Sequence, residues 1–330
     1  MSARARIITG LAVITLFAGT ALGPPGCGSD DEDGSKTPKK DASSDTSQDG
    51  SGGSAGSGGS AGSGGATSDT YSVKVVPDAK GLQVGKSRLQ LEVTTLSDGK
   101  PVPALADSLL LNPLMKMQSM SHGAPVPVDA VKESATPGVY DATLFFSMAS
   151  GTMGDWSLEV SLGGEPIATL PIKVDEAPGT DTTHVSLKHA ADTIKTPMGT
   201  DKARNWFVFR DTLAASGAGH DFEVFLATVQ DGNLVWPPVT VGLKLRDTAG
   251  KEKLTVQSLS MQASTDGATW TPMTCGVTAR CKASLSGLGK GAKSDVLIKL
   301  AVNGVDYTTD GNAVDPTQKN GFATFSVTAP

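Results

Sequence analysis

The stretch from Leu114 to Gly123 carries the chain's densest group of side chains that could bind a metal. It holds Met115, Met117, Met120 and His122, in a chain that has nine methionines and four histidines in all. Thioether sulfur is a ligand that Cu(I) favours, and imidazole binds both Cu(I) and Cu(II). This stretch is therefore a candidate copper site.

The geometry of such a site depends on whether the chain turns at Gln118 and Ser119. On a continuous strand, side chains alternate between the two faces, so Met115 and Met117 share one face and Met120 and His122 share the other. One metal could then use Met120 and His122 directly.

A third ligand would have to come from another strand, and Met148 and Met153 are the candidates. Five of the nine methionines lie between positions 115 and 153. The alternative is that these methionines fill gaps in an apolar core, as flexible thioether side chains often do. His122 would then cap a polar loop.

Composition indicates an all-β protein with about two domains. The chain has 330 residues, 39 Gly, 19 Pro and 38% hydrophobic residues, and a domain of ordinary size has roughly 100–200 residues. Many Gly, Pro and Thr residues between short apolar runs are typical of strands joined by tight turns. The net charge is −6 and no Lys/Arg-rich run stands out, so we expect no nucleic-acid partner.

The first 26 residues are typical of an export signal. Arg4 and Arg6 precede the apolar run Ile7–Leu22, which is too short for a comfortable membrane span of about 20 residues. Two cleavage interpretations remain open. The segment Ala21-Leu22-Gly23 fits ordinary secretion, whereas Leu22 to Cys27 resembles a bacterial lipobox, in which Cys27 receives a lipid and starts the mature chain.

The cysteines favour the lipoprotein interpretation. The chain has three, Cys27, Cys275 and Cys281, and an exported protein usually pairs its thiols. Cys275 and Cys281 can close a short disulfide loop, which leaves Cys27 for a lipid. We therefore expect a protein anchored to the outer membrane, on its periplasmic or cell-surface side, with secretion as the alternative.

Residues 27–69 form an acidic and then Gly/Ser-rich segment with almost no apolar side chains. Such a composition cannot bury enough surface to offset the entropy of ordering, so we predict a disordered linker.

Two immunoglobulin-like antiparallel β-sandwich domains are predicted after the linker, over residues 70–175 and 181–330. Alternating apolar and polar residues predict strands in both parts. In the first domain these are Tyr71–Pro77, Ser87–Thr95, Val139–Ser147, Trp156–Leu162 and Ile167–Val174. In the second they are His184–Lys188, Asn205–Ala214, Asp221–Gln230, Val239–Arg246, Leu254–Ser264, Val296–Val302 and Phe322–Thr328.

The first predicted domain resembles a known family in three segments. They are Met115-x-x-x-x-Met120-Ser121-His122, Pro137-Gly138-Val139-Tyr140 and Met153-Gly154-Asp155-Trp156-Ser157-Leu158. This order resembles the YtkA-like domain, a small exported β-sandwich related to the FixH and CopC-like copper-associated modules. The resemblance covers about a third of the chain. It implies a non-catalytic copper-binding module, with ligands among Met115 or Met117, Met120, His122 and Met153.

Catalytic motifs are missing from the sequence, so we expect no enzyme. It has no Gly-x-Ser-x-Gly elbow, no His-Glu-x-x-His motif and no phosphate-binding Gly loop after a strand. Three functions remain open. They are an exported copper-binding lipoprotein, a structural or interaction lipoprotein that contacts an unidentified envelope protein without a metal, and a glycan-binding adhesin that uses Trp236.

Overall fold

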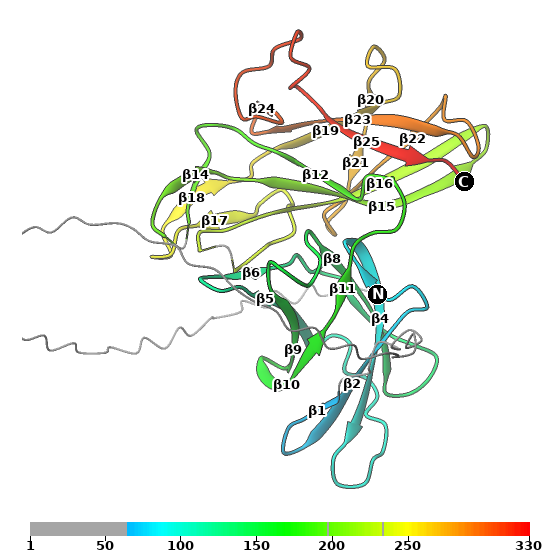
Figure 1. Ribbon diagram of the computed structural model, residues 1–330, viewed down its shortest axis with the longest axis vertical. Coiled ribbons are helices and arrows are strands. Elements are labelled where there is room, and N and C mark those ends of the chain that lie inside the picture. Colours follow the sequence, from blue (N-terminus) through cyan, green and yellow to red (C-terminus); the bar gives the residue numbers. More distant parts are fainter. Residues whose placement is uncertain (1–64, 197, 233) are drawn as a thin grey trace, which may run out of the picture. The chain divides into compact units, whose positions relative to one another are not determined.

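The computed structural model describes residues 65–196, 198–232 and 234–330, and this part of the chain is built from strands alone (Figure 1). It contains no helix long and apolar enough to cross a membrane. The predicted signal peptide, Cys27 and most of the predicted linker lie outside the described residues. The described residues all belong to one compact unit, and their fold is all-β, as the composition predicts.

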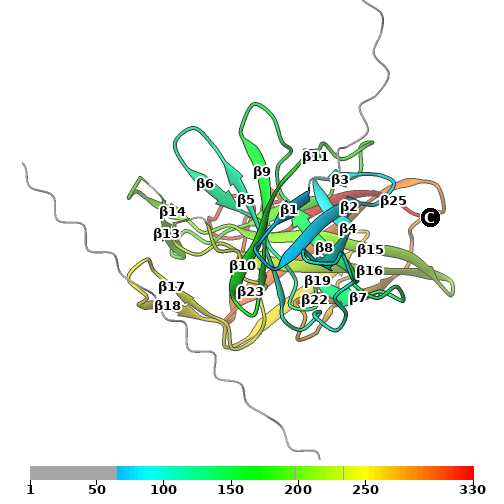
Figure 2. The same cartoon turned by 90° about the horizontal axis from the view of Figure 1, so that it is seen from below.

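Two packed sheets, which we call the first sandwich, form the part that carries the Met/His stretch. One sheet has the order β1-β2-β4-β8-β7 and the other has the order β10-β9-β5-β6. Figure 2 shows β9, β5 and β6 side by side. The strands are β1 (Gly65–Thr67), β2 (Tyr71–Pro77), β4 (Gly85–Thr95), β5 (Leu109–Lys116), β6 (Ser121–Gly123), β7 (Val131–Glu133), β8 (Val139–Phe146), β9 (Asp155–Leu162) and β10 (Glu165–Ile172). A short parallel pair, β3 (Leu82–Gln83) and β11 (Val174–Asp175), completes it.

The core of the first sandwich follows from the period-2 pattern of its strands. In β4, Leu89, Leu91 and Val93 are buried, because alternate side chains of a strand point to the same face. The opposite sheet contributes Trp156, whose ring meets that of Phe146 edge-on at a centroid distance of 5.1 Å.

The described part of the chain begins inside the stretch predicted as linker, and it begins with a strand. Strand β1 pairs with β2, with Gly65 opposite Lys74. The connecting turn is closed by the Ser68 hydroxyl oxygen, which accepts a hydrogen bond from the Tyr71 backbone N–H at 2.8 Å. Composition alone does not show this, because backbone pairing needs no apolar side chains.

Two further packed sheets form what we call the second sandwich. One has the order β12-β15-β16-β22-β21; the other has β20-β19-β23-β24, with β25 also paired to β23. The strands are β12 (His184–Leu187), β15 (Trp206–Ser216), β16 (Gly219–Thr228), β19 (Leu259–Ser264), β20 (Thr271–Pro272), β21 (Thr274–Cys275), β22 (Arg280–Leu285), β23 (Lys293–Val302), β24 (Val305–Tyr307) and β25 (Ala323–Thr328). Two hairpins accompany them, β13 (Thr193–Lys195) with β14 (Asp201–Ala203), and β17 (Lys244–Arg246) with β18 (Glu252–Thr255).

A predicted strand over Leu254–Ser264 is instead split into β18 and β19. Between the two strands, the Asn303 side-chain oxygen accepts hydrogen bonds from the backbone N–H groups of Gln257 and Ser258, at 2.7 and 3.0 Å. The hydrogen bonds of these amides are therefore satisfied outside any sheet. The chain can then pass from the β17–β18 hairpin to the sheet that contains β19.

A buried polar network stabilises the second sandwich near its first strands. Arg204 is fully buried, and its Nε donates to Asp192 Oδ1 at 2.9 Å. The other Asp192 oxygen accepts from Trp206 Nε1 at 2.8 Å and from the Tyr307 hydroxyl at 3.1 Å. Burial, and then the charge of Asp192, raise the pKa of Tyr307, so its hydroxyl stays protonated and donates.

Aromatic side chains join the two sandwiches. Phe145 in β8 lies on the opposite face from its buried neighbour Phe146 and contacts Phe225 and Phe209 of the second sandwich. The ring centroids are 4.5 and 5.3 Å apart, respectively. All three rings are fully buried. The C-terminal end of β8 is therefore buried on both faces, with Phe146 in the first core and Phe145 in a cluster at the junction of the sandwiches.

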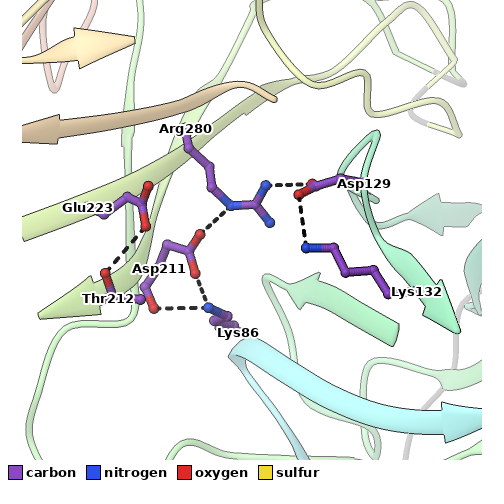
Figure 3. A network of polar contacts seen from close by, with 7 residues as sticks. All are labelled: Lys86, Asp129, Lys132, Asp211, Thr212, Glu223 and Arg280. Atoms are coloured by element: carbon purple, nitrogen blue, oxygen red, sulfur yellow. Dashed lines mark hydrogen bonds and ion pairs between the residues drawn. The ribbon is translucent and has the colours of Figure 1, made fainter. Parts of the chain in front are cut away.

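A charged network also crosses between the sandwiches (Figure 3). Arg280 Nε contacts Asp211 at 2.5 Å, and an Nη nitrogen of Arg280 contacts Asp129 of the first sandwich at 2.5 Å. Lys86 of the first sandwich also pairs with Asp211, whose side chain is 2% exposed. Asp211 is thus a nearly buried carboxylate that pairs with one cation from each sandwich, and the network adds charged contacts between the two.

Candidate metal centre

The Met/His stretch folds as a hairpin. Strand β5 ends at Lys116, the Met117 backbone N–H donates to the Met120 carbonyl at 2.9 Å, and β6 returns alongside. Met115 then stands opposite His122 in the ladder. The chain therefore turns at Gln118 and Ser119, so the single-strand geometry, with Met115 and Met117 on one face, does not apply.

Four of the six predicted metal ligands lie away from a common site. Met115 is fully buried in the core of the first sandwich, and Met117 and Met148 are half-buried against the same core. Met153 is 55% exposed in the connection between β8 and β9. These positions follow the alternation of the strands, which turns Met115 toward the interior as a packing residue.

Met120 and His122 do line a common cavity of about 430 Å³. The wall opposite the hairpin belongs to the second sandwich, and it includes Met198 in the connection between β13 and β14. The complete lining is Met120, His122, Ile194, Thr196, Met198, Thr200, Lys202, Ala203, Asn205, Phe207, Val229 and Trp236. The structure thus brings two thioethers and one imidazole to the same cavity.

Aromatic rings fix the position of the imidazole. The His122 ring lies 4.7 Å from the Trp236 ring, and Phe207 lies 4.6 Å from Trp236, measured between centroids. Trp236 is only 5% exposed, so the exposed glycan-binding edge considered from the sequence does not exist at this residue.

Close backbone contact also holds the hairpin in place. A Cβ atom added to Gly123 would lie 2.1 Å from the Leu234 carbonyl oxygen. Only glycine therefore lets β6 approach the segment before Trp236 this closely. The approach sets His122, the preceding residue, against the second sandwich.

The electrostatic environment leaves the imidazole neutral. His122 Nδ1 is buried and has no hydrogen-bond partner among the described residues. Burial lowers the pKa of His122 below its ordinary value of 6.5, because the charged form loses solvation. A neutral imidazole keeps a lone pair that can bind a metal.

A second polar atom of the cavity is also unsatisfied. Asn205 Oδ1 is buried and finds no hydrogen-bond donor in the described part of the chain. The backbone of this residue is held in place, because its carbonyl accepts a 2.9 Å hydrogen bond from the Thr228 hydroxyl.

Of the cavity residues that sequence reasoning did not assign to the site, Met198 is the one that adds a thioether and Asn205 has an unsatisfied polar atom. Met198 is 76% exposed and stands alone in a turn, so no local pattern links it to the Met/His stretch. Its only sequence signal is that it is one of the few methionines outside the first domain. The described residues, those of this cavity included, contain no group of three or more His, Cys, Asp or Glu side chains that could hold a metal.

Cys275 and Cys281 form a disulfide across the β21–β22 pair, where they stand opposite each other. The loop between them is closed by a hydrogen bond from the Gly276 N–H to the Arg280 carbonyl at 2.8 Å. The disulfide therefore constrains the start of β22, the strand that carries Arg280.

Comparison with known proteins gives no family. No family model matches the chain, and no curated protein matches it. Among solved structures it is similar to the adhesin InvE of Yersinia pseudotuberculosis, with a TM-score of 0.23 and 14% identity over 79% of this chain and 60% of that chain. It is also similar to domains 5-6 of the S-layer protein SbsC, with a TM-score of 0.22 and 9% identity over 80% of this chain and 99% of that chain. The chain thus spans 60% of the adhesin chain, and both TM-scores are too low to bear on function.

Proposed function

We propose that this protein is an exported, non-catalytic envelope protein that binds Cu(I) through Met120, His122 and Met198. Its first sandwich is the part that resembles the YtkA-like domain. The predicted N-terminal export signal, and Cys27 as the cysteine left over beside the Cys275–Cys281 disulfide, support export and lipid anchoring at the outer membrane, with secretion as the alternative.

The observation that carries the copper assignment is the meeting of these three side chains at one cavity. The donor set suits the metal, because two thioethers and a neutral imidazole match the preference of Cu(I) for soft ligands. The unpartnered Nδ1 of His122 is consistent with this role, since a buried polar atom without a partner costs free energy.

Cu(I) is expected to raise the melting temperature of the protein, because a ligand that binds only the folded state stabilises it. At a free Cu(I) concentration of 100 times Kd the gain is about 2.7 kcal/mol. Met120→Leu, His122→Phe and Met198→Leu should each reduce the shift and weaken Cu(I) binding in a competition titration with a chromophoric chelator under anaerobic conditions.

Met153→Leu is the matched control, because Met153 belongs to the same predicted ligand set but is exposed and does not line the cavity. It should bind Cu(I) like the parent. A parent protein that shows no copper-dependent shift would rule out the assignment, and equal losses in Met153→Leu and Met198→Leu would rule out this donor set.

The pH dependence of Cu(I) binding should reveal the buried imidazole. Protons compete with the metal for His122, and burial lowers the pKa of this residue below 6.5. The affinity should therefore stay constant down to about pH 6.5 and fall only below it, by up to tenfold per pH unit. His122→Phe should remove this fall, and a parent affinity that already falls above pH 6.5 would contradict the assignment.

A structural envelope role without a metal is the second candidate. The observation that favours it is the fusion of the two sandwiches through Phe145 and Arg280, which makes a rigid unit of the kind that a scaffold for an envelope partner needs. The same copper titration separates the candidates, since the scaffold predicts no copper-dependent shift.

A further inference from the structure

The segment enclosed by the disulfide, residues 276–280, contributes to the junction of the two sandwiches. Ala279 is 1% exposed and belongs to the buried cluster that includes Phe145 of the first sandwich. The next residue, Arg280, forms an ion pair with Asp129 of the first sandwich (Figure 3). Two consecutive residues of this short segment therefore supply one apolar and one charged contact between the sandwiches.

The backbone of this segment is strained at the residue that enters the buried cluster. Ala279 has a φ of 59°, in the left-handed region that residues with a Cβ atom rarely adopt. Such a conformation persists only where the surroundings impose it. The Ala279 N–H donates to the Gly276 carbonyl at 3.2 Å, and the Gly276 N–H donates to the Arg280 carbonyl at 2.8 Å. Both hydrogen bonds lie within the segment that the disulfide closes, and a third, from the Leu226 N–H to the Ala279 carbonyl at 2.9 Å, ties it to β16.

The disulfide is therefore in a position to impose the strained conformation. A disulfide restricts the unfolded chain most when it closes a long loop, and these two cysteines are only six residues apart in the sequence. We therefore expect the main effect of this disulfide on the folded state, where it fixes the two ends of the strained segment.

A reductant can approach the disulfide from one side. Cys275 is partly exposed, whereas Cys281 is fully buried, and Val277 in the enclosed segment is 87% exposed. The thiolate of a dithiol can attack the Cys275 sulfur and release Cys281 as a thiolate, which takes up a proton. The second thiol of the reductant then closes its own disulfide and frees Cys275. The dithiol gives up the two electrons that the protein disulfide takes up.

We propose that the Cys275–Cys281 disulfide is a redox switch that controls the coupling of the two sandwiches. In the oxidised protein it holds Ala279 and Arg280 at the junction, so that the sandwiches unfold together. In the reduced protein the enclosed segment relaxes to unstrained backbone, the junction loses these contacts, and the sandwiches unfold separately. This inference does not depend on the proposed Cu(I) binding.

Calorimetry of the full-length protein with and without a dithiol tests the proposal. The oxidised protein is expected to show one unfolding transition and the reduced protein two separated transitions. The double variant Cys275→Ser/Cys281→Ser should show two transitions without reductant, and the dithiol should not change them. Because this variant keeps Cys27, it also controls for any effect of the dithiol on that cysteine.

Ala279→Gly tests whether backbone strain transmits the effect. Glycine adopts the left-handed region without the steric cost of a Cβ atom, so the segment should keep its conformation when the disulfide is reduced. The transitions of the reduced variant should therefore be separated less than those of the reduced parent. Ala227→Gly is the matched control, because it removes a methyl group from the same buried cluster at a position in β16 that has no positive φ. Its transitions should separate on reduction as those of the parent do.

Hydrogen exchange at a temperature below either transition gives a second measurement that does not require unfolding. Reduction should speed exchange in residues 276–280 and at Phe145, and should leave the core strand β9 unchanged.

Three outcomes would overturn the proposal. A single transition in the reduced parent, moved to lower temperature, would show that the disulfide stabilises the protein without controlling the coupling. Two transitions in the oxidised parent would show that the disulfide does not couple the sandwiches. Equal separation in reduced Ala279→Gly and in the reduced parent would exclude the strained residue as the element that the disulfide controls.

Discussion

Phe145→Ala is expected to lower the free energy of unfolding by about 3–5 kcal/mol, the range for removing a buried phenylalanine ring. The ring contacts Phe225 and Phe209 across the junction of the sandwiches, so its loss weakens the contact between them more than either interior. Calorimetry should therefore show one transition in the parent protein and two separated transitions in the variant.

Phe146→Ala is the matched control, because the next residue along β8 faces the first core and packs on Trp156. This substitution should lower the free energy of unfolding by a similar amount. It should do so by destabilising the first sandwich itself, and not the junction between the sandwiches. If the two variants gave the same unfolding profile, the junction would not be what couples the sandwiches.

Asp192→Ala is expected to destabilise the second sandwich by about 3–5 kcal/mol, the cost of leaving a buried charge without its partner. Arg204, with a side chain that is 0% exposed, would lose the carboxylate with which it is paired. Trp206 and Tyr307 would lose an acceptor as well. Urea unfolding followed by tryptophan fluorescence measures the loss, because Trp206 belongs to the network.

Asp201→Ala provides the comparison for an exposed pair. Asp201 lies 2.9 Å from Lys195, and both side chains are about half exposed. Such pairs contribute about 0–1 kcal/mol, so this substitution should change the free energy of unfolding very little. Asp192→Asn should fall between the two, because its amide oxygen can still accept from Trp206 while the charge of Arg204 stays unpaired. A small effect of Asp192→Ala would show that water or another group reaches Arg204.

The strands were largely predictable because period-2 alternation is a local property of the sequence. The range Tyr71–Pro77 is the same in prediction and structure, and β8 and β9 differ from their predicted ranges by one residue. Prediction was less accurate where a side chain distant in sequence accepts backbone hydrogen bonds that a neighbouring strand would otherwise accept. Asn303 interrupts the predicted strand from Leu254 to Ser264 in this way, and the sequence of that segment does not indicate the interruption.

The sequence by itself determined the all-β class, the paired positions of Cys275 and Cys281, and the candidate donors Met120 and His122. Each of these follows from the composition or from the spacing of residues that are close together in the sequence. Alternation also implied that Met115 could turn inward, but the sequence left open whether it packs or binds a metal.

Only the tertiary structure decided which donors meet. Met198 and Asn205 reach the cavity because the second sandwich packs against the β5–β6 hairpin, with Gly123 allowing the close approach to Leu234. A site shared by two sandwiches depends on contacts between residues far apart in the chain. Local patterns carry no information about such contacts, because the burial and charge pairing that bring them together exist only in the folded protein.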